Sequence, residues 1–320
     1  MSEPLLVVRN LEVRYGTFVA VAGMSFDLHA GETVGLVGES GSGKSSLGRA
    51  ILRLISASGG QVLWRGEDLL LSSPRKLRQQ RRDLQIVFQD PLASLNPRMT
   101  IGDALAEPLK IFEPDLSAAL RASKVAHMLE RVGLTALMVA RYPHEFSGGQ
   151  CQRIGIARAM MLRPQLLICD EPVSSLDVSI QGQIVNLLAD LQQEFGTAML
   201  FISHNLAVVR HLSHRVMVIY RGRLVEAAPR DALFAAPAHP YTRALLAAVP
   251  DLEHAAGASG TAVEPPPSRE VGRVAEPSPA GCVFYDRCAH ARSVCLNTVP
   301  ILQETGPGHW VACHRWRELV

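Results

Sequence analysis

A glycine-rich turn near residue 40 has the composition and spacing of a phosphate-binding loop. Residues 38–45 read Gly-Glu-Ser-Gly-Ser-Gly-Lys-Ser, which fits the pattern G-x-x-x-x-G-K-[ST]. Glycines let successive backbone N–H groups point inward, while Lys44 can reach the outer phosphates and the Ser45 hydroxyl can ligate Mg²⁺. The residues expected to contact the nucleotide here are Gly38, Glu39, Ser40, Gly41, Ser42, Gly43, Lys44, Ser45 and Ser46. Alone, this loop predicts only a nucleoside triphosphate site, which a kinase, a GTPase or a motor would also have.

A second feature that could do chemistry is an apolar run ending in two carboxylates. Leu166–Cys169 is continuously apolar, and Asp170 and Glu171 follow it. If the run is a strand, both acids lie at its C-terminal edge beside the phosphate loop. Asp170 would then hold Mg²⁺, and Glu171 would polarise the attacking water as a general base. The alternative is an acid pair that faces solvent at the end of a strand.

The elements that must position these motifs begin with a small β layer. Leu5–Val13 and Val19–Leu28 alternate apolar and polar residues, which predicts antiparallel strands with one solvated face. Thr33–Val37 predicts a short buried strand before the glycine loop, and the apolar spacing within Ser45–Ile55 predicts a helix after it. Strand, loop and helix therefore follow in the order that phosphate binding requires.

The rest of the chain predicts an α/β core with a helical insertion. Leu166–Cys169 and Met199–Ile202 are apolar runs separated by the predicted helix Ile184–Leu191, which is typical of parallel strands covered on both faces. Residues from about 90 to 163 have mostly helical spacing and predict an inserted helical subdomain. Several prolines are expected to break its helices: Pro91, Pro97, Pro108, Pro114 and Pro143.

Composition narrows the class of protein. The 320 residues carry 32 Lys and Arg against 30 Asp and Glu, a net charge of +2, which gives no reason to expect a nucleic-acid partner. No apolar run approaches the roughly 20 residues that span a bilayer, and the first residues lack the layout of a signal peptide. We therefore expect a protein that stays in the cytoplasm, with its cysteines reduced or bound to metal.

The segment Phe146-Ser147-Gly148-Gly149-Gln150, before the predicted helix Arg153–Met161, resembles the L-S-G-G-Q signature of the ATP-binding-cassette ATPases. A serine and two glycines that open a helix form a second anion site; a glycine helix cap is the alternative. In this family two subunits pair head to tail, so that each nucleotide lies between one phosphate loop and the other subunit's signature. The resemblance implies an α/β fold over residues 1–235: a RecA-like P-loop core, an N-terminal antiparallel β subdomain and the inserted helical subdomain.

The resemblance implies roles for further residues. Tyr15 is similar to the aromatic residue that stacks on adenine. Gln89, after the apolar run Leu84–Phe88, is similar to the glutamine that touches Mg²⁺ and the attacking water, and His204 resembles the histidine that contacts the γ-phosphate. For both, an ordinary surface residue is the alternative. Ser174-Ser175-Leu176-Asp177 resembles the loop that contacts the partner subunit, and Asp177 is also expected near the nucleotide. The implied ligands of Mg²⁺ are Ser45, Gln89 and Asp170.

Two segments indicate the branch of the family. Residues 89–97 and His239–Leu246 resemble segments of ATPase subunits from bacterial dipeptide and oligopeptide importers, which nickel and glutathione importers share. Phe146–Arg153 is most similar to the second ATPase subunit of such systems, which implies a heterodimer. Implied partners are a companion ATPase, two membrane permeases and an extracytoplasmic solute-binding protein, with this chain peripheral on the cytoplasmic face of the inner membrane. The rival interpretation is an ATPase that acts in DNA repair or on ribosomes. Repair relatives place a long coiled coil between the phosphate loop and the signature, and this sequence has no room for one there. Ribosome-acting relatives carry two cassettes in one chain, whereas this sequence has one.

Residues 236–320 predict an extension with a linker over 251–281 and a cysteine tail over 282–320. The linker is rich in Ala, Gly, Ser, Glu and Pro. The tail holds Cys282, Cys288, Cys295 and Cys313 in a stretch too short to build its own core, which fits a metal staple. Some relatives of this branch carry a [4Fe–4S] cluster at such cysteines. Zinc and metal-free thiols stay open, although the spacing lacks the close C-x₂-C pairs of ordinary zinc ribbons, and His290, His309 and His314 could also join a site. An iron–sulfur redox sensor that uses nucleotide only structurally is a third functional hypothesis. Cys151 and Cys169 are predicted to be small buried residues.

Overall fold

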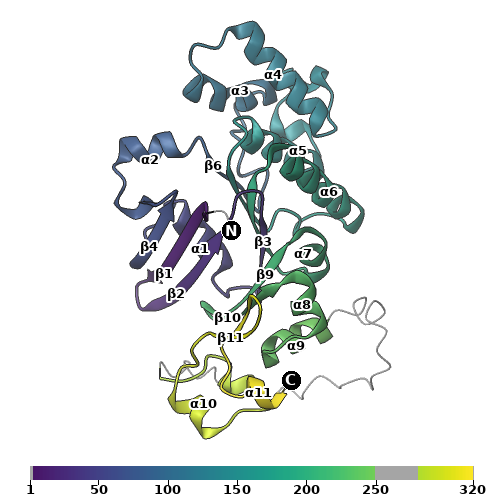
Figure 1. Ribbon diagram of the computed structural model, residues 1–320. Coiled ribbons are helices and arrows are strands. Elements are labelled where there is room, and N and C mark those ends of the chain that lie inside the picture. Colours follow the sequence, from purple (N-terminus) through teal and green to yellow (C-terminus); the bar gives the residue numbers. More distant parts are fainter. Residues whose placement is uncertain (1–2, 249–279, 320) are drawn as a thin grey trace.

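Helix α1 (Lys44–Ile51), which follows the glycine loop, lies between two β-sheets (Figure 1). The computed structural model describes residues 3–248 and 280–319. Helix α1 packs against strands of both sheets, and Gly48 faces Ile168 and Ile202 so closely that an added Cβ would lie 3.1 Å from a methyl group of each. The phosphate loop is therefore anchored at its C-terminal end by a helix with little free space around it.

The first sheet is antiparallel and confirms the predicted N-terminal strands. Leu6 pairs with Leu28 and Val8 with Phe26, and alternate residues of the first strand are buried. This one-sided burial is what the alternating pattern in the sequence requires. The strands, in spatial order, are β2 (Phe18–Leu28), β1 (Leu6–Tyr15), β4 (Gly59–Trp64) and β5 (Glu67–Asp68).

The second sheet forms the core and is parallel in its central part. Strands β3, β8 and β7 are buried along their whole length, as the continuous apolar runs predict. Because β3, β8, β7 and β6 are parallel neighbours, their carboxyl ends share one edge of the sheet. Its strands, in spatial order, are β11 (Gln303–Gly306), β12 (His309–Val311), β10 (Arg223–Pro229), β9 (Arg215–Tyr220), β3 (Thr33–Val37), β8 (Ala198–Ser203), β7 (Leu166–Asp170) and β6 (Leu84–Val87).

Ten further α-helices follow α1 in the described part of the chain. In Figure 1, α3 and α4 lie at one end of the molecule, and the C-terminal strands and helices lie at the other. In the described part of the chain, no helix is both long enough and apolar enough to cross a membrane. The helices are α2 (Pro74–Gln80), α3 (Ile101–Phe112), α4 (Ala118–Arg131), α5 (Gly148–Met160), α6 (Val178–Phe195), α7 (Leu206–Leu212), α8 (Arg230–Ala235), α9 (Pro240–Ala247), α10 (Ser293–Asn297) and α11 (Trp316–Leu319). Short 3₁₀ turns cover Leu69–Leu71, Ala136–Ala140, Pro143–Glu145 and Tyr285–Arg287.

One predicted helix break is wrong. Pro108 lies inside α3, where it removes one backbone donor but does not end the helix. The apolar face of α3 buries Ile101, Leu105 and Leu109, and the Thr100 side chain caps the start of the helix by accepting a hydrogen bond from the N–H of Asp103. Packing and capping therefore outweigh the lost hydrogen bond.

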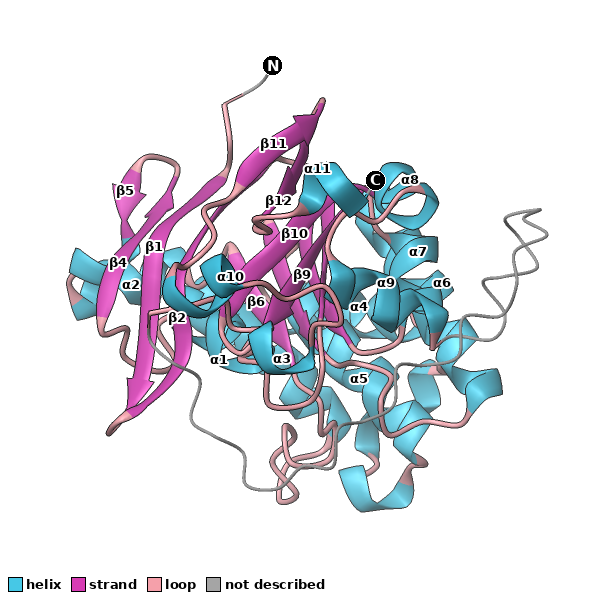
Figure 2. Cartoon of the chain, turned by 90° about the horizontal axis from the view of Figure 1, so that it is seen from below, coloured by secondary structure: helices cyan, strands magenta, loops and turns pink. Residues whose placement is uncertain are grey.

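The C-terminal segment, residues 280–319, continues the central sheet. Strand β12 pairs antiparallel with β10, and β11 pairs with β12 (Figure 2). Phe284 is buried against Tyr220 and Tyr241, so the segment shares the core of the preceding fold. The sequence predicts that this stretch is too short to build a core of its own, and in the structure it packs onto the core of the preceding residues. The predicted linker 251–281 falls almost wholly outside the described residues.

Glu226, a fully buried carboxylate on β10, joins the C-terminal segment to the sheet. It accepts hydrogen bonds from the backbone N–H groups of Ala238 and His239, at 2.7 and 2.9 Å, and its Oε1 lies 2.7 Å from His309 Nε2. Burial raises the pKa of Glu226, but these hydrogen bonds outweigh burial and hold the pKa below its usual value. The ionised carboxylate is therefore the stable form in the fold.

We expect Glu226→Ala to lower the free energy of unfolding by roughly 3 kcal/mol, because two buried N–H groups and one imidazole lose their partner. Denaturant titration measures this change. Asp231→Ala is the control, since that exposed carboxylate pairs with its neighbour Arg230 at the surface, and it should leave the unfolding midpoint in place.

The effect of Glu226 should also depend on pH. A folded-state pKa below the usual value stabilises the fold above the pKa of an unfolded glutamate, and this contribution is lost as the pH falls. The difference between wild type and Glu226→Ala should therefore shrink on acidification. Equal midpoints at neutral pH would contradict the assigned role.

Candidate active site

The phosphate loop runs from β3 to α1 and is packed so closely that two of its positions admit only glycine. An added Cβ on Gly43 would lie 2.1 Å from the carbonyl oxygen of Ala20, and one on Gly38 would lie 2.3 Å from that of Ile219. Gly43 also has a φ of +101°, a conformation that other residues rarely adopt. The strands β2 and β9 thus fix the shape of the loop.

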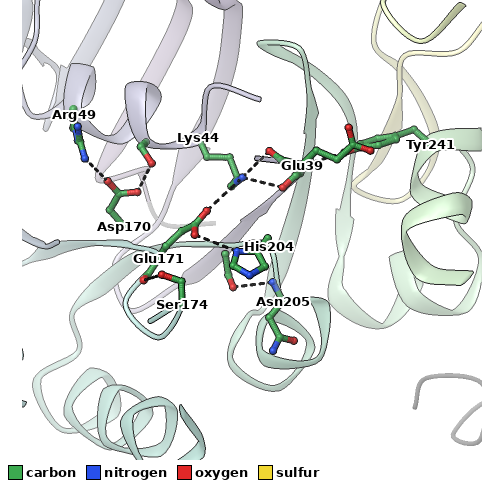
Figure 3. Close-up of polar contacts among 12 residues, drawn as sticks. Glu39, Lys44, Arg49, Asp170, Glu171, Ser174, His204, Asn205 and Tyr241 are labelled. Atoms are coloured by element: carbon green, nitrogen blue, oxygen red, sulfur yellow. Dashed lines mark hydrogen bonds and ion pairs between the residues drawn. The ribbon is translucent and has the colours of Figure 1, made fainter. Parts of the chain in front are cut away.

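Lys44 is 4% exposed and lies at the centre of the site (Figure 3). Its Nζ donates to the carbonyl oxygens of Gly38 and Glu39, both at 2.9 Å, and lies 3.6 Å from Glu171 Oε1. Burial lowers the pKa of Lys44, and the nearby carboxylate of Glu171 opposes this shift. In addition, the Ser42 hydroxyl is buried and has no hydrogen-bond partner among the described residues. A buried ammonium beside an unpartnered hydroxyl suits an anionic ligand.

Asp170 connects the end of β7 to the start of α1. Its Oδ1 accepts a hydrogen bond of 2.6 Å from the Ser45 hydroxyl, and its Oδ2 lies 3.3 Å from Arg49 Nη2. The sequence predicts that Ser45 and Asp170 lie close together, but it does not indicate the contact between Arg49 and Asp170. A hydroxyl and a carboxylate side by side are oxygen ligands of the kind that Mg²⁺ takes.

Glu171 follows Asp170 in a left-handed backbone conformation, with φ +47°. This conformation is strained for a residue other than glycine, and such strain gathers at functional sites. The Glu171 carboxylate points toward Lys44 on one side, and on the other its Oε2 lies 3.1 Å from His204 Nδ1 (Figure 3). The structure therefore brings Lys44, Glu171 and His204 into one chain of polar contacts, from three separate elements.

The other predicted contacts near this edge are exposed. Gln89 follows β6, and the pairing of Val87 with Cys169 makes it leave the sheet at the same edge as Glu171. Tyr15, which is 52% exposed, ends β1, and its hydroxyl lies 3.4 Å from that of Ser46 on α1. Tyr15 thus lies beside the start of α1, and Gln89 lies at the same edge of the sheet as Glu171.

The signature segment lies on another part of the surface. Ser147 caps α5, where its hydroxyl accepts a hydrogen bond from the N–H of Gln150, and the Gln150 side chain accepts one from the N–H of Ser147. Gly149 packs against Ile180 of α6, and Asp177, which precedes α6, is exposed. Within residues 3–248 and 280–319, no hydrogen bond or ion pair joins the signature to the phosphate loop.

Two contacts to Glu39 are absent from the sequence-based expectations. The hydroxyl of Tyr241 accepts a hydrogen bond of 3.0 Å from the Glu39 N–H, and Arg287 Nη1 lies 2.8 and 2.9 Å from the two carboxylate oxygens. The separation along the chain, 202 and 248 residues, leaves no local signal for either contact. The only hint is that Tyr241 belongs to the segment His239–Leu246.

The four cysteines of the tail line one small, partly enclosed cavity, together with His290 and His314. Burial, and the nearness of the other thiols, raises the pKa of Cys282 to about 11. In the part of the chain that the structure describes, no three His, Cys, Asp or Glu side chains are grouped closely enough to hold a metal ion. Cys151 and Cys169 are buried elsewhere, which confirms that expectation.

Comparison with known proteins decides the family. Residues 21–174 match the family model described as "ABC transporter", and residues 225–295 match "Oligopeptide/dipeptide transporter, C-terminal region". Over 307 residues the chain is 50% identical to the oligopeptide transport ATP-binding protein OppF of Haemophilus influenzae, covering 93% of this chain and 89% of that protein. The chain belongs to the ABC ATPases of oligopeptide and dipeptide transporters. The family resemblance predicted from the signature and the phosphate loop is thereby confirmed, and with it ATP hydrolysis.

Further relatives agree with this membership. The ATPase is 50% identical over 320 residues to a putative peptide import ATP-binding protein of Brucella ovis, covering 98% of each. Among solved structures it resembles the dimeric cassette MJ0796 bound to ADP and Pi, with a TM-score of 0.65 and 26% identity over 70% of this chain and 98% of that one. It also resembles cbiO1 of Clostridium perfringens, with a TM-score of 0.66 and 25% identity over 73% of this chain and 92% of that one.

We expect Gly43→Ala in the ATPase to weaken ATP binding by roughly ten-fold or more, because the new methyl group overlaps the Ala20 carbonyl oxygen and the φ angle is strained. Equilibrium binding of ATP to the purified chain measures the change. Gly182→Ala is the matched control, since its Cβ would meet open space on α6 and affinity should be unaffected. Wild-type affinity in Gly43→Ala would contradict the close packing of the loop.

Proposed function

We propose that this ATPase powers the import of dipeptides or oligopeptides through a membrane transporter. The observation that carries the proposal is the polar chain of Lys44, Glu171 and His204 beside the phosphate loop, in a protein whose relatives are named as peptide import and oligopeptide transport ATP-binding proteins. Those names favour peptides over the nickel and glutathione cargoes of related importers.

In this proposal each polar group of the site has a task. Ser45, Asp170 and Gln89 would hold Mg²⁺, which neutralises charge on the phosphates. Glu171 accepts a proton from the water that attacks the γ-phosphorus, and the bond to the bridging oxygen of ADP breaks. His204 orients the Glu171 carboxylate and lies near the γ-phosphate.

Lys44 has two states in this mechanism. Without phosphates its ammonium contacts the Glu171 carboxylate at 3.6 Å. When phosphates enter the loop, they compete for the ammonium and leave Glu171 free to act as a base. Tyr15 stacks on the adenine, since its ring is half exposed at the margin of the loop.

The signature would complete the site of a neighbouring subunit. Ser147, Gly148, Gly149 and Gln150 open α5 at the surface and make no hydrogen bond or ion pair with this chain's own phosphate loop in the described residues. Asp177 is exposed close to them and would face the same partner. A similar cassette is dimeric with ADP and Pi bound. We infer a head-to-tail pair with two shared sites, formed with a companion ATPase as a heterodimer.

The remaining assignments follow from this assembly. Residues 1–235 form the cassette, with a helical subdomain over about 90–163 that would dock on two permease subunits near residues 89–97. Leu92, 49% exposed, offers an apolar contact there. Residues 236–320 form the C-terminal extension. The ATPase would lie on the cytoplasmic face of the inner membrane and work with an extracytoplasmic solute-binding protein.

Glu171→Gln tests the mechanism. We expect turnover in the reconstituted transporter to fall by roughly 10²- to 10⁴-fold, because the amide cannot accept the proton of the attacking water. ATP binding should persist, and the variant should accumulate as an ATP-bound dimer, measured by light scattering with and without ATP. Glu194→Gln, on the surface of α6, is the control and should turn over like wild type.

Two results would contradict the mechanism. One is unchanged turnover of Glu171→Gln in the transporter, which would also favour a structural role for the nucleotide. The other is full turnover by a strictly monomeric chain, because the proposed site needs the signature of a second subunit.

We also propose that the cavity of Cys282, Cys288, Cys295 and Cys313 holds a metal group. Four thiols that line one cavity are a donor set suited in kind to a [4Fe–4S] cluster or to zinc, and their protons would have to leave on binding. The thiols as they stand are not grouped at binding geometry, so binding would have to draw them together. The group would act as a staple for residues 280–319.

Anaerobic purification followed by absorbance spectroscopy and metal analysis distinguishes the outcomes. A broad visible absorbance with about four irons per chain indicates the cluster, and one zinc without colour indicates a four-thiolate zinc site. Cys295→Ser should remove the metal, whereas Cys151→Ala, whose thiol is buried elsewhere, should retain it. A folded wild-type chain without metal would overturn the proposal and leave metal-free thiols.

A further inference from the structure

Glu39 in the phosphate loop has three polar groups, and each has a partner. Its backbone carbonyl accepts from Lys44 Nζ, its backbone N–H donates to the Tyr241 hydroxyl, and its carboxylate pairs with Arg287. Only the first partner belongs to the loop. The other two come from α9 and from the turn that precedes Cys288, so the C-terminal part of the chain holds the outer limb of the loop from two sides.

Tyr241 is a rigid anchor. Its side chain is 1% exposed, and its ring packs against those of Tyr220 and Phe284, with centroids 4.6 and 5.4 Å away. His239 caps α9 by accepting a hydrogen bond of 3.0 Å from the Tyr241 N–H. Because both ends of the residue are fixed, the position of the hydroxyl is fixed as well (Figure 3).

Arg287 is held by more than its ion pair. Its guanidinium lies over the rings of Tyr220 and Phe284, 5.7 and 5.9 Å from their centroids. An exposed ion pair alone contributes little to stability, since both side chains lose conformational freedom when they pair. Here the aromatic faces already restrict Arg287, so pairing with Glu39 costs less entropy.

The charge of Glu39 makes this pairing matter for nucleotide binding. An unpaired carboxylate at the rim of the loop would repel a polyanionic triphosphate. Arg287 neutralises that carboxylate, and Tyr241 fixes the peptide whose carbonyl holds Lys44.

We propose that Tyr241 and Arg287 are positioning residues of the nucleotide site, through which the C-terminal segment sets the phosphate loop for ATP. The proposal rests on the proposed function in one respect: it takes the loop as the ATP site. Neither residue touches the substrate; both act through Glu39.

Equilibrium binding of ATP to the purified full chain tests the proposal. Tyr241→Phe keeps the ring but removes the acceptor, and we expect affinity to fall about 3- to 10-fold, the usual effect of one lost hydrogen bond. Arg287→Gln should weaken binding by a similar factor at low salt, and the difference should shrink as salt rises, because the exposed Glu39 carboxylate is then screened. In the reconstituted transporter, KM for ATP should rise while kcat stays near wild type.

Two further variants separate positioning from general stability. Adding Glu39→Gln to Arg287→Gln should restore affinity, since the repelling charge is gone, and Arg287→Lys should retain most of it. Arg292→Gln is the matched control: this arginine lies in the same segment but pairs with Glu318, and its loss should not change ATP affinity.

The outcomes distinguish this proposal from the proposed function. If wild type does not bind ATP, or Lys44→Ala binds it equally well, the assignment of the site fails. If wild type binds ATP and Lys44→Ala does not, but Tyr241→Phe and Arg287→Gln bind like wild type, only the positioning role is overturned. Equal weakening by Arg292→Gln would also overturn it, because that would indicate a general loss of structure in the segment.

Discussion

The site depends on a positive charge kept out of water. Moving the ammonium of Lys44 into the interior is costly unless every proton on it finds a partner. The loop supplies two carbonyl oxygens and the end of β7 supplies a carboxylate, which explains why the loop must curl so tightly. That curl places Gly43 and Gly38 against neighbouring backbone, so the demand for glycine follows from the demand to solvate one lysine.

The carboxyl ends of parallel strands do the rest of the positioning. Strands β3, β8, β7 and β6 deliver the phosphate loop, His204, Glu171 and Gln89 to one rim because the strands share a direction and a register. A parallel sheet thus gathers groups that are far apart in sequence without a dedicated contact for each. What it cannot supply is a donor on the opposite side of the nucleotide, and in the proposed head-to-tail pair the start of α5 has that task for the other chain.

Much of this could be predicted from the residues because the signals are local. The phosphate loop, the acids after Leu166–Cys169 and the alternating N-terminal strands each lie within one short stretch, and each was found where expected. The break at Pro108 was mispredicted, since local propensity yields to packing in a well-capped helix. Tyr241 and Arg287 were missed because their partner lies more than 200 residues away, and no periodicity reports a contact at that distance.

The pairing of β12 with β10 also covers an edge of the central sheet. Strand β10 would otherwise be the open margin of the central sheet, with a row of free N–H and C=O groups that can recruit strands from other molecules. The three residues of β12 occupy that margin, and the edge of the sheet becomes β11, a short strand that ends in glycine. In the folded chain the cysteine-bearing segment therefore replaces a seven-residue edge strand with a much shorter one, which leaves less exposed backbone for strands of other molecules to pair with.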